Sequence, residues 1–272
     1  MLVSQNRSAT RWVCSAALTL IATTVLAHDT WLLPSRFSSA SGRTVSVDLT
    51  SGMAFPQLEY AIKPERVQRA VSLCPSGEQA MPGPKRKEKA LRFAARCSNP
   101  GVAQIIVELA PKDLELTPDK VAEYLHEIGA EETIGRVWSA LPEPKRWRER
   151  YVKHAKTYVR FGSGSIVRVP PEAGMSLEIV PEEDPTLLRV GGTLSMVLMD
   201  HGTPLTDAKV GIVSPGVPDS FATTDASGRA KIPLTRGGTW LLRFTRLRRS
   251  SIRDLEWESD FTTMSFEVLP SK

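Results

Sequence analysis

Of the four histidines in the chain, His28 has the position best suited to binding a metal ion. The residues before it have the features of a secretion signal, and cleavage after Ala27 would make His28 the first residue of the exported protein. An N-terminal histidine offers a cation two nitrogens, the α-amine and the ring Nδ1, which together close one chelate ring. Nitrogen donors suit nickel, cobalt, copper and zinc better than magnesium or calcium. His28 is therefore a candidate ligand for a divalent transition metal; the alternative is that it only begins a strand.

A metal bound at His28 needs further ligands from other parts of the fold. The third residue of the cleaved chain is Thr30, so the square-planar motif that has histidine at that position is absent. His154 is the best candidate for a second nitrogen ligand, although a histidine on an apolar face is also a common hydrogen-bonded core residue. Glu59 is a loop carboxylate that could bind the ion or hydrogen-bond the imidazole of His28. The predicted metal site is therefore His28, His154 and Glu59.

Other residues that could do chemistry have simpler interpretations. We expect His126 on the polar side of a helix and His201 in an Asp-His-Gly turn, both in contact with solvent. Asp225 lies in an Asp-Ala-Ser-Gly sequence that is typical of a hairpin turn. The sequence has no His-Glu-x-x-His, Gly-x-Ser-x-Gly, P-loop or dinucleotide-binding glycine pattern. It therefore favours a binding protein over an enzyme.

Residues 1–27 predict export from the cytoplasm. They contain two arginines and no acidic residue, followed by a largely apolar run from Trp12 to Leu26. Val25 and Ala27 are the small residues expected at positions minus three and minus one of a signal-peptidase site. An uncleaved membrane anchor is the alternative, but the apolar run of about 15 residues is short for a bilayer. We expect a periplasmic or secreted protein that begins at His28.

The charge of the chain does not favour a nucleic-acid partner. There are 35 Lys and Arg residues against 30 Asp and Glu residues, a net charge of +5 that falls to +3 without the two signal arginines. The basic runs alternate with acids or loops, which is typical of solvated surfaces. They lie at Lys85–Lys87, Lys145–Arg150 and Arg246–Arg249.

Cys74 and Cys97 are the two cysteines that remain after removal of the signal. In an oxidising compartment such a pair is most simply a disulfide, the alternative being two buried thiols. Each cysteine ends an apolar, strand-like run, and the two runs could pair as a hairpin.

Hydrophobic periodicity predicts a mainly β protein made of two immunoglobulin-like β-sandwiches with a helical insertion between them. Residues 28–110 form the predicted N-terminal sandwich and residues 163–272 the C-terminal one, which begins with a Gly/Ser/Pro linker to Gly174. The predicted strands are Thr44–Leu49, Val67–Cys74, Leu91–Cys97, Val102–Leu109, Leu177–Val180, Thr193–Met199, Ala208–Val213, Ala230–Leu234, Thr239–Thr245 and Thr263–Leu269.

Residues 111–162 form the predicted helical insertion. Thr117-Pro118-Asp119 is typical of a helix start, because threonine caps well and proline fits the first turn. A second short helix is expected over Glu131–Ala140. The longest helix is predicted over Lys145–Phe161, where aromatic residues and His154 recur at spacings of three, four and seven.

Several motifs, in the same order along the chain, resemble a family of exported proteins described as NikM-like or as the periplasmic component of ABC-type cobalt/nickel transport. The resemblance implies a nickel or cobalt ligand and an inner-membrane permease as partner. The residues that carry it are His28–Phe37, Phe55–Pro56 with Glu59, Tyr124–Gly129, Arg148–Tyr151 with His154–Lys156, Leu177–Pro181 with Asp184–Pro185, Gly202–Leu205, Thr224–Arg229 and Gly238–Trp240.

Three functions follow as hypotheses. The first is a non-enzymatic periplasmic protein that captures nickel, cobalt or copper through His28 and passes it to a permease. The second is a metal-free sandwich module that binds a protein, peptide or glycan. The third is a copper enzyme with an N-terminal histidine brace, which requires a second histidine on the same ion.

Processing is the first testable prediction. Exported protein should begin at His28, because Val25 and Ala27 fit the peptidase subsites. N-terminal sequencing or intact mass spectrometry of the secreted protein checks this. A chain that begins anywhere else would remove the chelating amine and with it the basis of the metal hypothesis.

Overall fold

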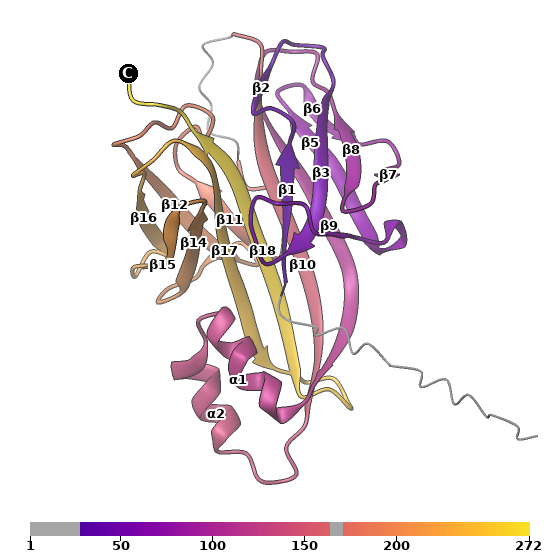
Figure 1. Cartoon of the computed structure of the whole chain (residues 1–272), viewed down its shortest axis with the longest axis vertical. Coiled ribbons are helices and arrows are strands. Elements are labelled where there is room, and N and C mark those ends of the chain that lie inside the picture. Colours follow the sequence, from indigo (N-terminus) through magenta and orange to yellow (C-terminus); the bar gives the residue numbers. More distant parts are fainter. Residues whose placement is uncertain (1–27, 164–170) are drawn as a thin grey trace, which may run out of the picture.

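The chain is a mainly β protein built from three packed sheets and one helical segment, as Figure 1 shows for the computed structural model. The structure describes residues 28–163 and 171–272. The predicted signal and residues 164–170 of the predicted linker lie outside the described residues. The predicted fold class, β-sandwiches with helices inserted between them in sequence, is confirmed.

The largest sheet has nine strands and runs through the whole molecule. Its order is β15-β14-β17-β18-β10-β9-β5-β6, with β2 also paired to β10. β10 pairs antiparallel with β9 but parallel with β18. The bounds are β2 (Ser38–Ser39), β5 (Val67–Cys74), β6 (Gly77–Ala80), β9 (Gly101–Leu116), β10 (Trp147–Phe161), β14 (Lys209–Ser214), β15 (Val217–Thr223), β17 (Gly238–Arg249) and β18 (Trp257–Val268).

Two smaller sheets cover opposite faces of this central sheet. Side chains alternate along a strand, so Ala155 and Val159 of β10 pack against the N-terminal sheet, while Tyr158 packs against the C-terminal one. The N-terminal sheet has β1 (Asp29–Pro34), β3 (Val45–Gly52), β8 (Leu91–Ala95) and β7 (Lys85–Arg86), with β4 (Tyr60–Ala61) paired to β3. The C-terminal sheet has β11 (Leu177–Pro181), β12 (Thr193–Asp200) and β13 (Thr203–Pro204), with β16 (Arg229–Pro233) paired to β12.

Hydroxyl groups of β18 hold β1 against the central sheet. Thr263 Oγ1 donates to the carbonyl of Thr30 at 2.6 Å, and Ser265 Oγ donates to the carbonyl of Leu32 at 2.5 Å. β1 is an edge strand of its sheet, and edge carbonyls without partners are costly when buried. These two bonds therefore fix the start of the described chain onto the molecule.

The helical segment lies between β9 and β10 and packs at the lower end of the sheet in Figure 1. α1 (Pro118–Glu127) begins at the predicted proline, and its stripe of Val121, Tyr124 and Leu125 is buried, as its periodicity predicts. A π-helical turn, η2 (Glu131–Gly135), leads into the short α2 (Arg136–Ser139). A short 3-10 turn, η1 (Pro64–Arg66), precedes β5. No helix in the described residues has both the length and the hydropathy needed to cross a membrane.

The helix predicted over Lys145–Phe161 is wrong, because most of this run is strand β10. A strand buried on both faces carries large side chains at successive positions, so the simple period of two that identifies half-buried strands is lost. The aromatic spacing then happens to match a helix. Pairing with β9 on one side and β18 on the other decides the conformation. The proposed domain limits at residues 110 and 162 stay a prediction.

The predicted disulfide between Cys74 and Cys97 is confirmed, but the predicted hairpin is wrong. β5, which ends at Cys74, belongs to the central sheet, whereas β8, which precedes Cys97, belongs to the N-terminal sheet. The bond therefore links two layers of a sandwich and not two neighbouring strands. Both cysteines are buried in the core that these layers share.

Removal of this cross-link should destabilise the protein measurably. Replacing both cysteines by serine should lower the free energy of unfolding by about 2–4 kcal/mol, because the unfolded chain regains the freedom of the closed loop. Denaturant unfolding of oxidised wild type, reduced wild type and the double variant checks this. Equal midpoints for all three would contradict the prediction.

Candidate functional site

His28 lies immediately before β1, on the face of the N-terminal sheet that is turned toward the central sheet. Thr30 and Ser51 are register partners on β1 and β3, and Ser51 pairs in turn with Tyr60 of β4. Residues two apart share a face of a strand, so His28, Thr30, Ser51 and Tyr60 lie on one side. The half-buried His28 ring stacks on Tyr60, with 5.1 Å between ring centroids and 5° between planes. The imidazole is thus held by an aromatic platform.

Lys153 of β10 holds the backbone of the same residue. Its ammonium donates a hydrogen bond to the carbonyl of His28 and lies over the rings of Tyr151 and Phe261, 5.4 and 5.1 Å from their centroids. The pKa of Lys153 is lowered to about 8, chiefly by burial; the charge of Asp29 opposes this lowering and the charge of Arg66 contributes to it. Burial, together with the charge of Lys153, also lowers the pKa of His28. The neutral imidazole, the form that binds metals, is therefore favoured.

Glu59 lies near His28, but its carboxylate already has partners. Oε1 accepts hydrogen bonds from the backbone amides of Met53 at 2.9 Å and Ala54 at 2.7 Å. Gly52 makes room for this arrangement, because a Cβ atom there would collide with the Glu59 carboxyl group. The negative charge of Glu59 still acts on the pKa of His28, where it opposes the lowering. Glu59 is thus placed to influence the His28 ring without contacting it in the described structure.

Asp29, the other carboxylate beside His28, is also paired. Its Oδ2 lies 2.5 Å from Nη1 of Arg243 on β17, and Arg243 also contacts Asp219 at 3.2 Å. In addition, Ser51 Oγ donates a hydrogen bond to the backbone carbonyl of Asp29 at 2.9 Å. These contacts anchor the first strand residue to two sheets.

The structure does not bring His154 to His28. His154 follows Lys153 on β10, so its side chain points to the opposite face of the central sheet. There its Nδ1 lies 3.0 Å from Glu108 and its Nε2 lies 2.9 Å from Ser176 and 3.5 Å from Asp260. Within residues 28–163 and 171–272, no group of three or more His, Cys, Asp or Glu side chains is arranged to hold a metal ion. The ligand set predicted from sequence is therefore not assembled in one place.

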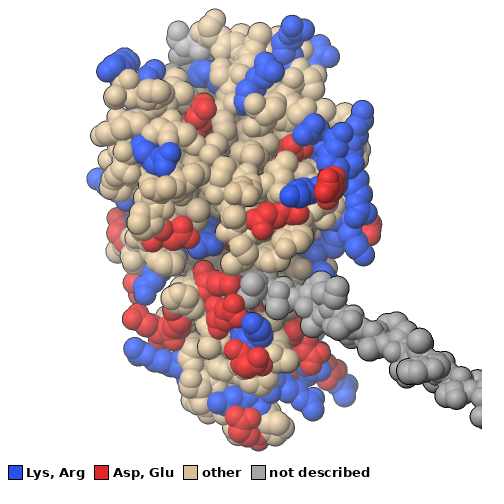
Figure 2. Space-filling view, in the orientation of Figure 1, with Lys and Arg blue, Asp and Glu red and all other residues tan. Residues whose placement is uncertain are grey.

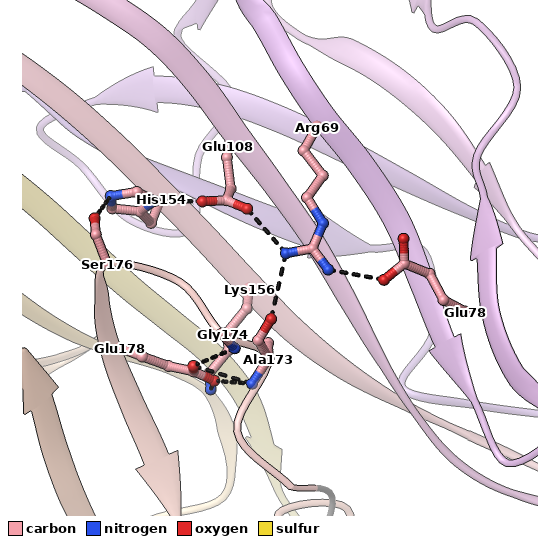
Figure 3. Close-up of polar contacts among 9 residues, drawn as sticks. All are labelled: Arg69, Glu78, Glu108, His154, Lys156, Ala173, Gly174, Ser176 and Glu178. Carbon is pink, nitrogen blue, oxygen red and sulfur yellow. Dashed lines mark hydrogen bonds and ion pairs between the residues drawn. The ribbon is translucent and has the colours of Figure 1, made fainter. Parts of the chain in front are cut away.

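Ser176, His154 and Glu108 are connected in the order of a catalytic triad, as Figure 3 shows for these residues. Asp260 makes such a role unfavourable. Ser176 Oγ donates to Asp260 at 3.1 Å, and the two carboxylates raise the pKa of His154 despite its burial. Contacts with His154 and Arg248 lower the pKa of Asp260 to about 2. These contacts favour the protonated imidazole, which cannot accept a proton from serine, so the arrangement is that of a buried ion network and not of a triad.

The network continues to both sides of His154 and fixes residues 171–176 on the sheet. Arg69 joins Glu108 at 3.0 Å to Glu78 at 2.8 Å and also donates to the carbonyl of Ala173 (Figure 3). Lys156, two residues beyond His154, forms a fully buried ion pair with Glu178 at 2.6 Å. These partners could not be predicted from the sequence, because they come from strands that meet only in the folded sheet.

The two remaining histidines are exposed. The side chain of His126 is 81% exposed, with Nδ1 2.5 Å from Glu131. His201 is 69% exposed and occupies a turn with a φ of 49°, next to Asp200. Both agree with the predicted contact with solvent. Figure 2 shows basic and acidic side chains interspersed over the lower part of the molecule, as expected for a solvated surface.

A known protein family matches most of the chain. Residues 25–247 match a family described as Domain of unknown function (DUF4198). The chain belongs to this DUF4198 family. The match spans most of the predicted motifs, from the residues around His28 to β17. No curated protein matches the chain.

Solved structures with some similarity to this DUF4198 protein include an adhesin, an alpha-2-macroglobulin and a set of fibronectin(III)-like modules. The Escherichia coli adhesin FdeC is 13% identical with a TM-score of 0.24, and the match covers 80% of this chain and 58% of that one. The E. coli alpha-2-macroglobulin is 10% identical with a TM-score of 0.22, covering 90% and 16%. The fibronectin(III)-like modules of Clostridium thermocellum CbhA are 8% identical with a TM-score of 0.19, covering 88% and 94%. The chain thus spans less than two thirds of the first two, and at such TM-scores the fold rests on the strand pairing alone.

The stabilising effect of His154 should depend on pH. Because the folded-state pKa is raised, its contribution is complete below the unfolded pKa of 6.5 and is lost as the pH rises through the raised folded value. His154→Gln should therefore lower stability by about 3 kcal/mol at pH 6 and by clearly less at pH 9. Denaturant unfolding at the two pH values measures this.

His201→Gln is the matched control for that measurement. It also removes a histidine beside an aspartate, but at an exposed turn, so it should leave stability unchanged at both pH values. A loss for His154→Gln that is the same at pH 6 and pH 9 would show that the imidazole is not charged in the network.

Proposed function

We propose that this DUF4198 protein is an extracytoplasmic binding protein for a divalent transition metal, captured at His28 after signal cleavage. The fixed position of His28 carries the proposal. A first residue normally frays, but here the ring is stacked on Tyr60 and the carbonyl is held by Lys153. A chelating residue that is ordered before the metal arrives loses less conformational entropy when it binds.

The chemistry of His28 selects the class of ion. The free amine, with a pKa of about 8, and a neutral imidazole are both available near neutral pH. Two nitrogen donors on one residue favour nickel, cobalt or copper. With Glu59 and Asp29 already engaged, His28 leaves several coordination positions open. An incompletely ligated ion exchanges readily, which suits capture and transfer more than storage.

The transfer partner belongs to the same proposal. The resemblance to NikM-like proteins implies an inner-membrane permease for nickel or cobalt, and the buried disulfide between Cys74 and Cys97 suits an oxidising compartment such as the periplasm. Delivery to a permease requires an accessible site. His28 is half-buried and its platform Tyr60 is 56% exposed.

A module that binds a protein, peptide or glycan is the second candidate. Two large exposed apolar side chains lie near the proposed site: Tyr60 beside His28, and Met53, 49% exposed, whose amide binds Glu59. Exposed side chains of this kind are common in binding surfaces. The copper-enzyme hypothesis, by contrast, loses the second histidine that it requires, since His154 faces the other side of the sheet.

The metal proposal predicts a strong dependence on the first residue. His28→Ala should weaken nickel binding by at least about a hundredfold, because it removes one of the two nitrogens of a chelate. One extra glycine before His28 should weaken binding almost as much, because the amine becomes an amide. Isothermal titration calorimetry with nickel, cobalt and copper on the correctly cleaved protein measures both effects.

His201→Ala is the control, since it removes an exposed histidine that has no part in the site. It should bind nickel as the wild type does. If the wild type, His28→Ala and the extended chain all have the same affinity, the metal proposal is wrong, and a partner-binding module becomes the better account.

A further inference from the structure

Lys153, which contacts His28, and Arg66, which contacts the ring of Tyr151 near Lys153, have no carboxylate partner among the described residues. Lys153 contacts the carbonyl of His28 and two aromatic rings. No Asp or Glu within residues 28–163 and 171–272 lies at ion-pair distance from it, although the charges of Asp29 and Glu149 raise its pKa. Arg66 of η1 donates to the carbonyl of Ala110 at 2.6 Å and more weakly to Tyr151 Oη at 3.4 Å. Most other partly buried basic groups of the fold have a carboxylate, as the pairs of Arg69, Arg148 and Lys156 show.

Both cations contact the ring of Tyr151. The guanidinium of Arg66 and the ammonium of Lys153 each lie 5.4 Å from the centroid of the Tyr151 ring. They repel each other, and the charge of Arg66 lowers the pKa of Lys153. Partly desolvated like charges are unfavourable without an anion. Nε of Arg66 is in addition buried without a hydrogen-bond partner.

Carboxylates near the site are already bound to other groups. Asp29 pairs with Arg243, and Glu59 accepts two backbone amides. Glu149, four residues before Lys153 on the same face of β10, is fully buried and accepts hydrogen bonds from Tyr124, Trp147 and Ser259. The carboxylates nearest His28 are therefore already engaged with other groups, and Lys153 adds a positive charge beside it.

An anion that arrives with the metal would resolve both problems. We propose that the site takes its metal as a complex with a small carboxylate chelator, whose free carboxylate binds Lys153 and Arg66 while His28 binds the metal. This inference rests on the proposed function and names its substrate class. The chelator supplies the ligands that the protein lacks, and the arginine side chain suits a carboxylate because its fork of N–H donors matches the two oxygens.

Equilibrium dialysis with nickel and radiolabelled citrate tests the proposal on the cleaved, full-length protein. Wild type should retain nickel and citrate together in a one-to-one ratio, and citrate without nickel about tenfold more weakly. Lys153→Met and Arg66→Met should each reduce citrate retention about tenfold, because a charged hydrogen bond is lost. Nickel binding by Arg66→Met in the absence of citrate should be equal to or stronger than that of wild type, because a positive charge is removed while the contact of Lys153 with His28 is kept. Arg253→Met, at a side chain that is 97% exposed, should retain both as wild type does.

The outcomes separate this inference from the proposed function. If His28→Ala retains nickel as well as wild type, the metal proposal fails and the inference fails with it. If wild type binds nickel through His28 but citrate strips the nickel without being retained, only the inference is wrong. Unchanged citrate retention in both Lys153→Met and Arg66→Met would also overturn it. Arg66 is only half-buried, so its variant gives a result even if Lys153→Met does not fold.

Discussion

The burial of cationic side chains on both faces of β10 is the constraint on which much of this structure depends. A central strand between two covering layers normally carries apolar residues, yet β10 carries Lys153, His154 and Lys156 in succession. An unpaired buried charge is very costly. Of these three, His154 and Lys156 have carboxylate partners, whereas Lys153 contacts a carbonyl and two aromatic rings. Glu178 of the C-terminal sheet compensates Lys156, and Glu108 and Asp260 compensate His154.

These ion pairs also determine how the layers meet. Glu178 accepts the amides of Ala173 and Gly174 as well as the ammonium of Lys156, so one carboxylate fixes the start of the C-terminal sheet onto β10. On the other face, Thr263 and Ser265 fix β1 by single hydroxyl bonds. The C-terminal layer is thus joined by buried charge, and the N-terminal layer by hydroxyl hydrogen bonds together with the ion pair of Asp29 and Arg243. The parallel pairing of β10 with β18 places both sets of groups within reach.

Local patterns predicted the parts of the fold that depend on local physics. The strands with one solvent-facing side, the helix that begins at Pro118 and the cysteine pair all follow from alternation, capping and compartment. The helix predicted from Lys145 to Phe161 was wrong because both faces of β10 are covered. The strands that pair with β10 are also distant in sequence, more than 30 residues away on β9 and about 110 away on β18. The predicted hairpin between the two cysteine strands was wrong for a related reason. A disulfide requires only that two cysteines lie close together, and it does not determine which sheet each strand joins.

The same limit applies to the candidate site. His28 could be identified from sequence because its significance comes from an adjacent cleavage signal, and its stacking partner Tyr60 directly follows the predicted Glu59. His154 was misplaced because a helix would have put it on a single apolar face, whereas on a strand one residue step reverses the side. The side chain of Lys153 therefore lies on the face of β10 that is turned toward His28, and the side chain of His154 lies on the opposite face. On β10, the residue that contacts His28 is therefore the cation Lys153 and not the nitrogen donor His154. For this reason we expect the bound species to be an anionic metal complex and not a bare metal ion.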